Sequence, residues 1–135
     1  VPECTFTDPE VARVGHTLAS AAAAGLGTRD FVQHFDAVDR ARLEGEEGGF
    51  ARVLIEEGSD AIVGATIVGR HAGELIALVA LAIESGAGLG DLASIVWPYP
   101  TRAQVLGAVA DQYQRSRLTP RNRRYLARWM AWRRR

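Results

Sequence analysis

The chain has 135 residues, 47% of them hydrophobic, and its 16 arginines balance its 16 acidic residues. This length is enough for one domain with a substantial core, and the composition is that of an ordinary globular protein. The sequence contains no apolar run long enough to cross a bilayer, and the single Cys4 excludes an internal disulfide, so we expect a cytoplasmic protein.

The even balance hides a division of charge along the chain. Residues 1–111 hold seven arginines and all sixteen acidic residues, whereas residues 112–135 hold nine arginines and no acidic residue. A basic end of this kind can bind an acidic face of its own domain, an anionic membrane or a nucleic acid. We expect docking or dimer packing, keep a membrane surface as the alternative for the stretch from Arg115 to Arg135, and expect no nucleic acid.

The first third of the chain predicts short strands and one alanine-rich helix. Residues 5–7 are predicted as a strand, and Thr17 as the N-cap of a helix that runs to Ala24. The small side chains of that helix favour close packing against a flat surface such as a sheet. Residues 31–35 are predicted as a strand, while residues 36–43 fit either a helical turn or an irregular strand.

The clearest strands are residues 50–55 and 62–68, because both are rich in β-branched side chains. The short polar segment between them predicts an antiparallel hairpin. Gly64 and Gly69 indicate a bulge or a close backbone approach in the second strand. Residues 73–85 then predict a helix that is apolar on more than one face, which favours burial both in the core and against a partner.

Two prolines stiffen the segment of residues 97–101 in front of a predicted helix. Each proline sets its own φ and favours extended geometry in the residue before it, so the peptide that carries Tyr99 is rigid. Thr101 and Gln104 match a capping box, which predicts a helix from Thr101 to about Arg115. A phenol is therefore presented beside the positive end of a helix dipole.

A short helix is predicted from Asp91, and a last helix from Pro120, where aromatic residues recur among arginines at helical spacing. Together the elements predict an α+β fold, an antiparallel sheet packed by helices on one face, with a helical Arg-rich C-terminal extension. We divide the chain into residues 1–119 and residues 120–135. Its start at Val1 indicates a cut inside a longer protein or a processed terminus.

Four segments of the chain carry a resemblance to a known family. They are residues 6–15, residues 39–41 with 49–53, residues 62–69 with 72–76, and residues 99–101. In this order and spacing they resemble the C-terminal dimerisation domain of FAD-dependent pyridine nucleotide–disulfide oxidoreductases, a family that includes glutathione reductase, dihydrolipoamide dehydrogenase and mercuric reductase. The resemblance covers residues 2–119 and implies a sheet-plus-helices domain that forms a homodimer.

The resemblance also implies a functional corner. The family carries a His-Pro-Thr-x-x-Glu motif, whose His faces the partner subunit's flavin and relays a proton, and whose Glu orients that His. Here Tyr99 stands at the His position and Gln104 at the Glu position, and Pro100 and Thr101 are expected near the partner's flavin. We expect upstream FAD and NAD(P)H domains in a parent oxidoreductase, no cofactor bound to this chain alone, and no metal.

The exchange at both motif positions changes the expected chemistry. A phenol with an ordinary pKa of about 10 is a poor base at neutral pH, and a neutral Gln cannot stabilise an imidazolium. We therefore expect that the usual proton relay is lost. For Tyr99 two readings stay open: a group that faces the partner's flavin, or a packed aromatic that anchors the turn.

Two alternatives stay open, one for the role of Tyr99 and one for the function of the whole chain. Mercuric reductases use a tyrosine in this general region, so Tyr99 could contact a soft metal substrate, but their C-terminal cysteine pair does not occur in this sequence. The second hypothesis for the whole chain is a stand-alone protein-interaction module that has the same fold and carries out no redox chemistry.

Overall fold

The computed structural model describes residues 1–117 and residue 133, and a five-stranded antiparallel sheet forms its centre. The strands are β1 (Glu3–Thr5), β2 (Val11–Gly15), β3 (Thr28–His34), β4 (Phe50–Glu56) and β5 (Ile62–Val68), in the spatial order β1-β2-β5-β4-β3. The helices are α1 (Leu18–Ala23), α2 (Asp39–Glu44), α3 (Ala72–Ser85), α4 (Leu89–Leu92) and α5 (Gln104–Ser116), with the 3-10 turn η1 (Phe35–Ala37) before α2.

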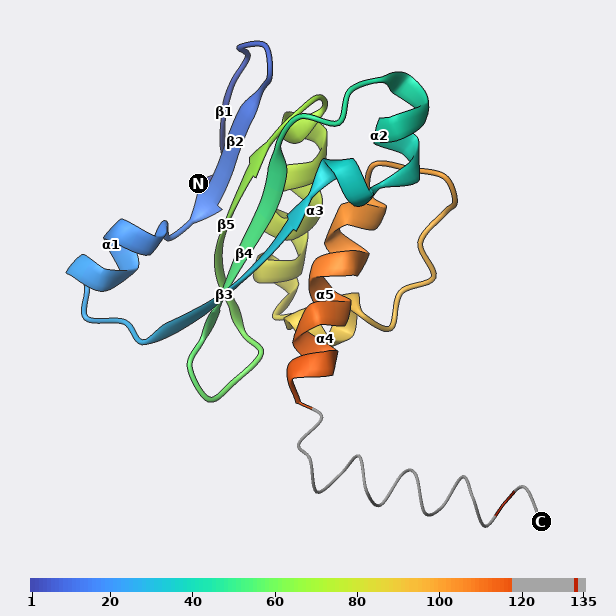
Figure 1. The fold of residues 1–135 in the computed structure, drawn as a ribbon. Helices are drawn as coiled ribbons and strands as arrows, with labels where there is room; N and C mark the ends of the chain where they lie inside the picture. The colour runs from blue at the N-terminus through green and yellow to red at the C-terminus, as the bar shows by residue number, and fades with distance from the viewer. Residues whose placement is uncertain (118–132, 134–135) are drawn as a thin grey trace.

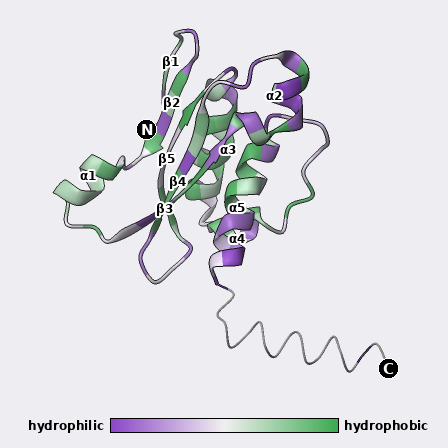
Figure 2. Ribbon diagram, in the orientation of Figure 1, coloured by the Kyte–Doolittle hydropathy of each residue, from purple (hydrophilic) through white to green (hydrophobic). Residues whose placement is uncertain are grey.

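The core lies between one face of the sheet and the two long helices (Figure 1). Successive strand residues point to opposite faces, so β4 buries Ala51, Val53 and Ile55 under the helices. α3 packs on β5 and β2, and α5 packs on β3 and β4. Figure 2 shows the apolar residues gathered on the sheet and α3, with hydrophilic residues on α2. The predicted α+β fold with helices on one face is confirmed.

The hairpin of β4 and β5 matches the prediction, including the irregularity at its glycine. Leu54 lies opposite Gly64 and Ile55 opposite Ile62, so β5 has one extra residue at this point. A Cβ at Gly64 would lie 2.0 Å from the carbonyl oxygen of His16, which means that two backbones touch there. The sequence predicts a bulge or a close backbone approach, and both occur beside Gly64.

The two edges of the sheet are β1 and β3. β1 has three residues. Along β3, the side chain of Gln112 on α5 donates a hydrogen bond to the carbonyl oxygen of Val32 at 2.8 Å and another to the side-chain oxygen of Gln33 at 2.9 Å. A helix side chain therefore occupies part of this edge.

The structure corrects the prediction for the first strand. A strand at residues 5–7 is wrong, because β1 ends at Thr5. Thr7 lies in the turn that follows, where its hydroxyl donates to the Pro9 carbonyl at 2.7 Å. The following strand, β2, was not predicted from the sequence. Its pairing with both β1 and β5 is a tertiary effect that a five-residue segment does not reveal.

The alanine-rich helix forms as predicted, but its surroundings differ. Thr17 caps α1 by accepting a hydrogen bond from the backbone of Ser20. Within α1 only Ala21 is buried, and Figure 1 shows the helix projecting beside the sheet, so its predicted packing against a sheet is wrong. The ambiguous residues 36–43 are helical, in η1 and α2.

The end of the chain is described by sequence alone. The helix predicted from Pro120 and the division at residue 119 lie outside the described residues. Among the helices that the structure does describe, none is long and apolar enough to cross a membrane.

Candidate functional site

Tyr99 lies on the loop that joins α4 to α5, and 71% of the residue is exposed. Its hydroxyl donates a hydrogen bond to Oδ2 of Asp39, the first residue of α2, at 2.9 Å. This hydrogen bond, the negative charge of Asp39 and partial loss of solvent all raise the pKa of Tyr99 above its ordinary value. At neutral pH the phenol is therefore protonated and oriented.

Gln104 acts on the backbone in front of α5. Its side-chain oxygen accepts a hydrogen bond from the N–H of Thr101 at 3.1 Å, while the Thr101 hydroxyl donates to the carbonyl of Pro98 at 2.8 Å. The Gln104 half of the predicted capping box is present, but the Thr101 half is wrong. α5 begins at Gln104. The carbonyls of residues 101–103 accept hydrogen bonds from the N–H three residues later, which is the pattern of a 3-10 turn and not of an α-helix.

Arg102 is a residue of this corner that the sequence analysis missed. It is only 6% exposed, and its Nε donates to Oε2 of Glu44 at 2.8 Å. A second nitrogen donates to the Glu46 carbonyl at 3.2 Å, and the guanidinium lies over the Phe35 ring. Hydrogen bonds from Arg40 and Arg102 lower the pKa of the Glu44 carboxyl. The acidic turn after α2 was the signal that could have indicated a basic partner.

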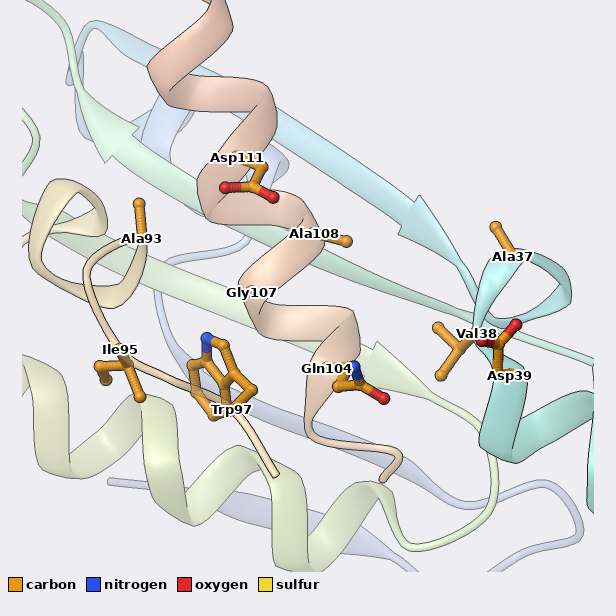
Figure 3. A pocket seen from close by; sticks show the side chains of 10 residues that line it. All are labelled: Ala37, Val38, Asp39, Ala93, Ile95, Trp97, Gln104, Gly107, Ala108 and Asp111. Atoms are coloured by element: carbon orange, nitrogen blue, oxygen red, sulfur yellow. The ribbon is translucent and has the colours of Figure 1, made fainter. Parts of the chain in front are cut away.

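A cavity of about 380 Å³ opens beside the corner, between α2, α5 and the loop that follows α4 (Figure 3). The indole of Trp97 forms one wall, and its nitrogen donates to the Leu92 carbonyl at 3.3 Å. Gly107 makes room for that ring, since a Cβ there would lie 2.6 Å from Trp97 Cδ1. The carboxylates of Asp39 and Asp111 stand on other sides, so the cavity combines an aromatic wall with acidic groups.

The structure brings the four predicted site residues into one corner but gives them different exposure. Tyr99 is mostly exposed, whereas Pro100, Thr101 and Gln104 are half-buried. Thr101 already forms two hydrogen bonds, one from its backbone N–H to Gln104 at the start of α5 and one from its hydroxyl to Pro98 in the loop. The described residues contain no group of three or more His, Cys, Asp or Glu side chains arranged to hold a metal ion.

Large apolar side chains are exposed at this corner and on α3. Val96 precedes the rigid segment and is 95% exposed, and Leu43 on α2 is 74% exposed. On α3, Leu78 and Leu81 point away from the core, with Leu81 66% exposed. Rigidly supported apolar groups of this kind are typical of surfaces that contact another protein.

Comparison with known proteins gives one consistent result. Residues 1–110 match the family described as the pyridine nucleotide-disulphide oxidoreductase dimerisation domain. The chain is 43% identical to a dihydrolipoyl dehydrogenase of Haloferax volcanii over 111 residues, which are 82% of this chain and 23% of that protein. It is 36% identical to a mercuric reductase of Shigella flexneri over 115 residues, 85% of this chain and 20% of that protein.

The solved structures agree on the fold. LpdA from Mycobacterium tuberculosis superposes with a TM-score of 0.79 at 24% identity, over 84% of this chain and 25% of that one. The copper(II) complex of the HOCl-induced flavoprotein disulfide reductase RclA from Escherichia coli gives 0.78 at 21% identity, over 83% and 25%. The chain thus spans about a quarter of the length of the proteins that it matches.

Proposed function

Because the chain belongs to the dimerisation-domain family of the pyridine nucleotide–disulphide oxidoreductases, we propose that it is the homodimerisation domain of a parent oxidoreductase that uses FAD and NAD(P)H. On this proposal the flavin and nucleotide sites belong to other domains of the parent, and Pro100 and Thr101 lie near the partner subunit's flavin. The proposal places the parent protein in the cytoplasm.

One observation carries this proposal beyond family membership: the rigid, outward-facing corner around Tyr99. Tyr99, Val96 and Leu43 are all largely exposed in the single chain, although prolines and the hydrogen bond to Asp39 hold Tyr99 in place. Ordering an exposed aromatic side chain costs conformational entropy, which contact with a second copy would offset.

The replacement of the usual His and Glu by Tyr99 and Gln104 supports a second part of the proposal, that this corner does not relay protons. The raised pKa of Tyr99 moves the phenol further from the range in which it could act as a base. Gln104 supports the loop backbone, which is a structural role.

Sedimentation velocity of the whole chain at micromolar concentration tests the dimer. We expect a dimer for the natural chain, a monomer for Val96→Asp, and an unchanged dimer for Leu18→Asp on α1, which lies away from the corner. A monomeric natural chain would contradict the proposal. A full-length parent purified without flavin would instead favour the stand-alone interaction module.

The arginine-rich end from Arg115 to Arg135 has a separate test. Sedimentation with anionic lipid vesicles, with and without residues 120–135, distinguishes a membrane surface from docking on an acidic face. Binding that disappears on deletion supports the membrane proposal. Equal sedimentation of the two chains removes it and favours docking within the dimer.

A further inference from the structure

The Tyr99–Asp39 hydrogen bond determines which atoms Tyr99 can offer to another molecule. We propose that Asp39 is a positioning residue that accepts the single hydrogen bond that the Tyr99 hydroxyl can donate, so that the lone pairs of the phenol oxygen face the partner subunit. The identity of the facing molecule rests on the proposed function, whereas the role of Asp39 rests on the contact itself.

The Tyr99 hydroxyl can donate fewer hydrogen bonds than it can accept. A tyrosine hydroxyl has one proton to donate and can also accept hydrogen bonds. In the structure the Tyr99 hydroxyl donates to Oδ2 of Asp39, 2.9 Å from the phenol oxygen, and a hydrogen bond to an ionised carboxylate is stronger than one to a neutral acceptor. In any further contact, the phenol oxygen of Tyr99 can therefore only accept a hydrogen bond.

Both members of the pair are held before any partner arrives. Tyr99 lies between Pro98 and Pro100, which fix the backbone on either side of it. Asp39 begins α2, and the far end of α2 is tied to the same loop by the hydrogen bond of Arg102 to Glu44. Near the pair, Arg40 and Arg102 both form ion pairs with Glu44, and the Asp111 carboxylate lines the same cavity as Asp39. The orientation of the phenol therefore does not depend on the partner.

This arrangement selects the chemical class of the group that faces Tyr99. An N–H, O–H or S–H donor gains a hydrogen bond from the phenol oxygen. A carboxylate or thiolate gains none, and the negative charge of Asp39 repels it. Tyr99 is thus predicted to meet a hydrogen-bond donor, and Asp39 acts on that contact only through Tyr99.

The first test is the titration of Tyr99 by NMR in the whole chain, with isotope-labelled tyrosine rings and Tyr99→Phe to assign its signal. We expect Asp39→Asn to lower the pKa of Tyr99 toward its ordinary value, because the carboxylate charge is removed, and Asp39→Glu to restore part of the rise. Asp36→Asn, which removes a carboxyl from neighbouring η1, is the matched control and leaves the pKa unchanged. An unchanged pKa in Asp39→Asn overturns the inference.

A double-mutant cycle on dimerisation provides the second test. Tyr99→Phe removes the acceptor, and we expect dimerisation to weaken roughly 3- to 10-fold, the range of one hydrogen bond. Asp39→Ala weakens it as well, but adding it to Tyr99→Phe has no further effect if Asp39 acts only through Tyr99. Additive losses overturn the inference. A monomeric natural chain would contradict the proposed function, while the titration would still decide the role of Asp39.

Discussion

Tyr99 and Gln104 occupy the two positions where the resemblance implies a catalytic pair, yet each bonds to a different part of the molecule. Tyr99 bonds to Asp39, which is 60 residues away in sequence, and Gln104 bonds to the backbone of Thr101. The carboxylate that orients residue 99 therefore comes from α2 and not from α5. At the scale of single residues, the negative charge beside Tyr99 is supplied by Asp39.

Substitutions at Gln104 test its backbone role. We expect Gln104→Ala to lower the free energy of unfolding by about 0.5–1.5 kcal/mol, since the Thr101 N–H loses its acceptor. Gln104→Glu keeps an acceptor and adds a negative charge at the start of α5, which is worth about 0.3–1 kcal/mol of stabilisation. Urea unfolding of the three chains measures the order, and equal stabilities would contradict the assigned role.

Gly64 provides a test of backbone contact at a single position. Gly64→Ala places a methyl group against the His16 carbonyl, so strands β2 and β5 must separate, and we expect a loss of about 1–3 kcal/mol. Gly48→Ala is the control, because nothing lies within 4 Å of a Cβ at that position. Thermal unfolding of both variants should show a clear loss for Gly64→Ala alone.

At the scale of elements, the loop before α5 and helix α2 form one unit. Tyr99 contacts the first residue of α2, while Arg102 contacts its last residue and the Glu46 carbonyl beyond it. These contacts join segments that are far apart in sequence, and the contact between Arg102 and Glu44 is partly buried. A substitution at either end of α2 is therefore expected to disturb the loop before α5.

Arg102→Ala tests this connection and its pH dependence. Glu44 has a lowered pKa in the folded chain, so its interactions stabilise the fold fully above the ordinary pKa of Glu and are lost as the pH falls through the folded value. We expect Arg102→Ala to reduce stability most at neutral pH and less in acid. Urea unfolding at several pH values measures the difference.

The exposed pair of Arg70 and Glu46 is the control for this experiment. Arg70→Ala should change stability little at any pH, because exposed ion pairs contribute little. A constant loss across the pH range for Arg102→Ala would indicate lost packing against Phe35 and not lost charge interaction.

At the scale of the whole molecule, α3 separates two environments. Its inner face supplies the core with Leu75, Ile76 and Val79, and its outer face presents Leu78 and Leu81. The sequence predicts that α3 is buried on both sides. In the single chain the inner side is buried in the core, and contact of the outer side with a second copy stays a prediction.

The outer face of α3 is tested by the concentration dependence of thermal unfolding. For a dimer, the midpoint temperature Tm rises with protein concentration, because association stabilises only the folded state. We expect this dependence in the natural chain and its loss in Leu81→Glu. Ala22→Glu, an exposed position on α1, serves as the control. A dependence that survives in Leu81→Glu would exclude α3 from the contact.

How much the sequence predicts depends on the range of the interactions involved. The β4–β5 hairpin and α3 follow from local patterns, and the rigid Pro-Tyr-Pro corner follows from proline geometry. The contacts of Tyr99 with Asp39 and of Arg102 with Glu44 join residues about sixty apart, so no local pattern contains them. The start of α5 was misplaced because Thr101 uses its hydroxyl in the preceding turn.

The edges of the sheet bear on how two copies can associate. β1 is only three residues long, and on β3, the other edge strand, the Val32 carbonyl accepts a hydrogen bond from the side chain of Gln112. Both features disfavour the addition of a further strand, which is how many sheets recruit partners or aggregate. Two copies of this chain are therefore expected to meet through side chains on a fixed surface, with each sheet ending inside its own subunit. Surface substitutions can therefore weaken or strengthen such a dimer without changing the strand pairing of either subunit.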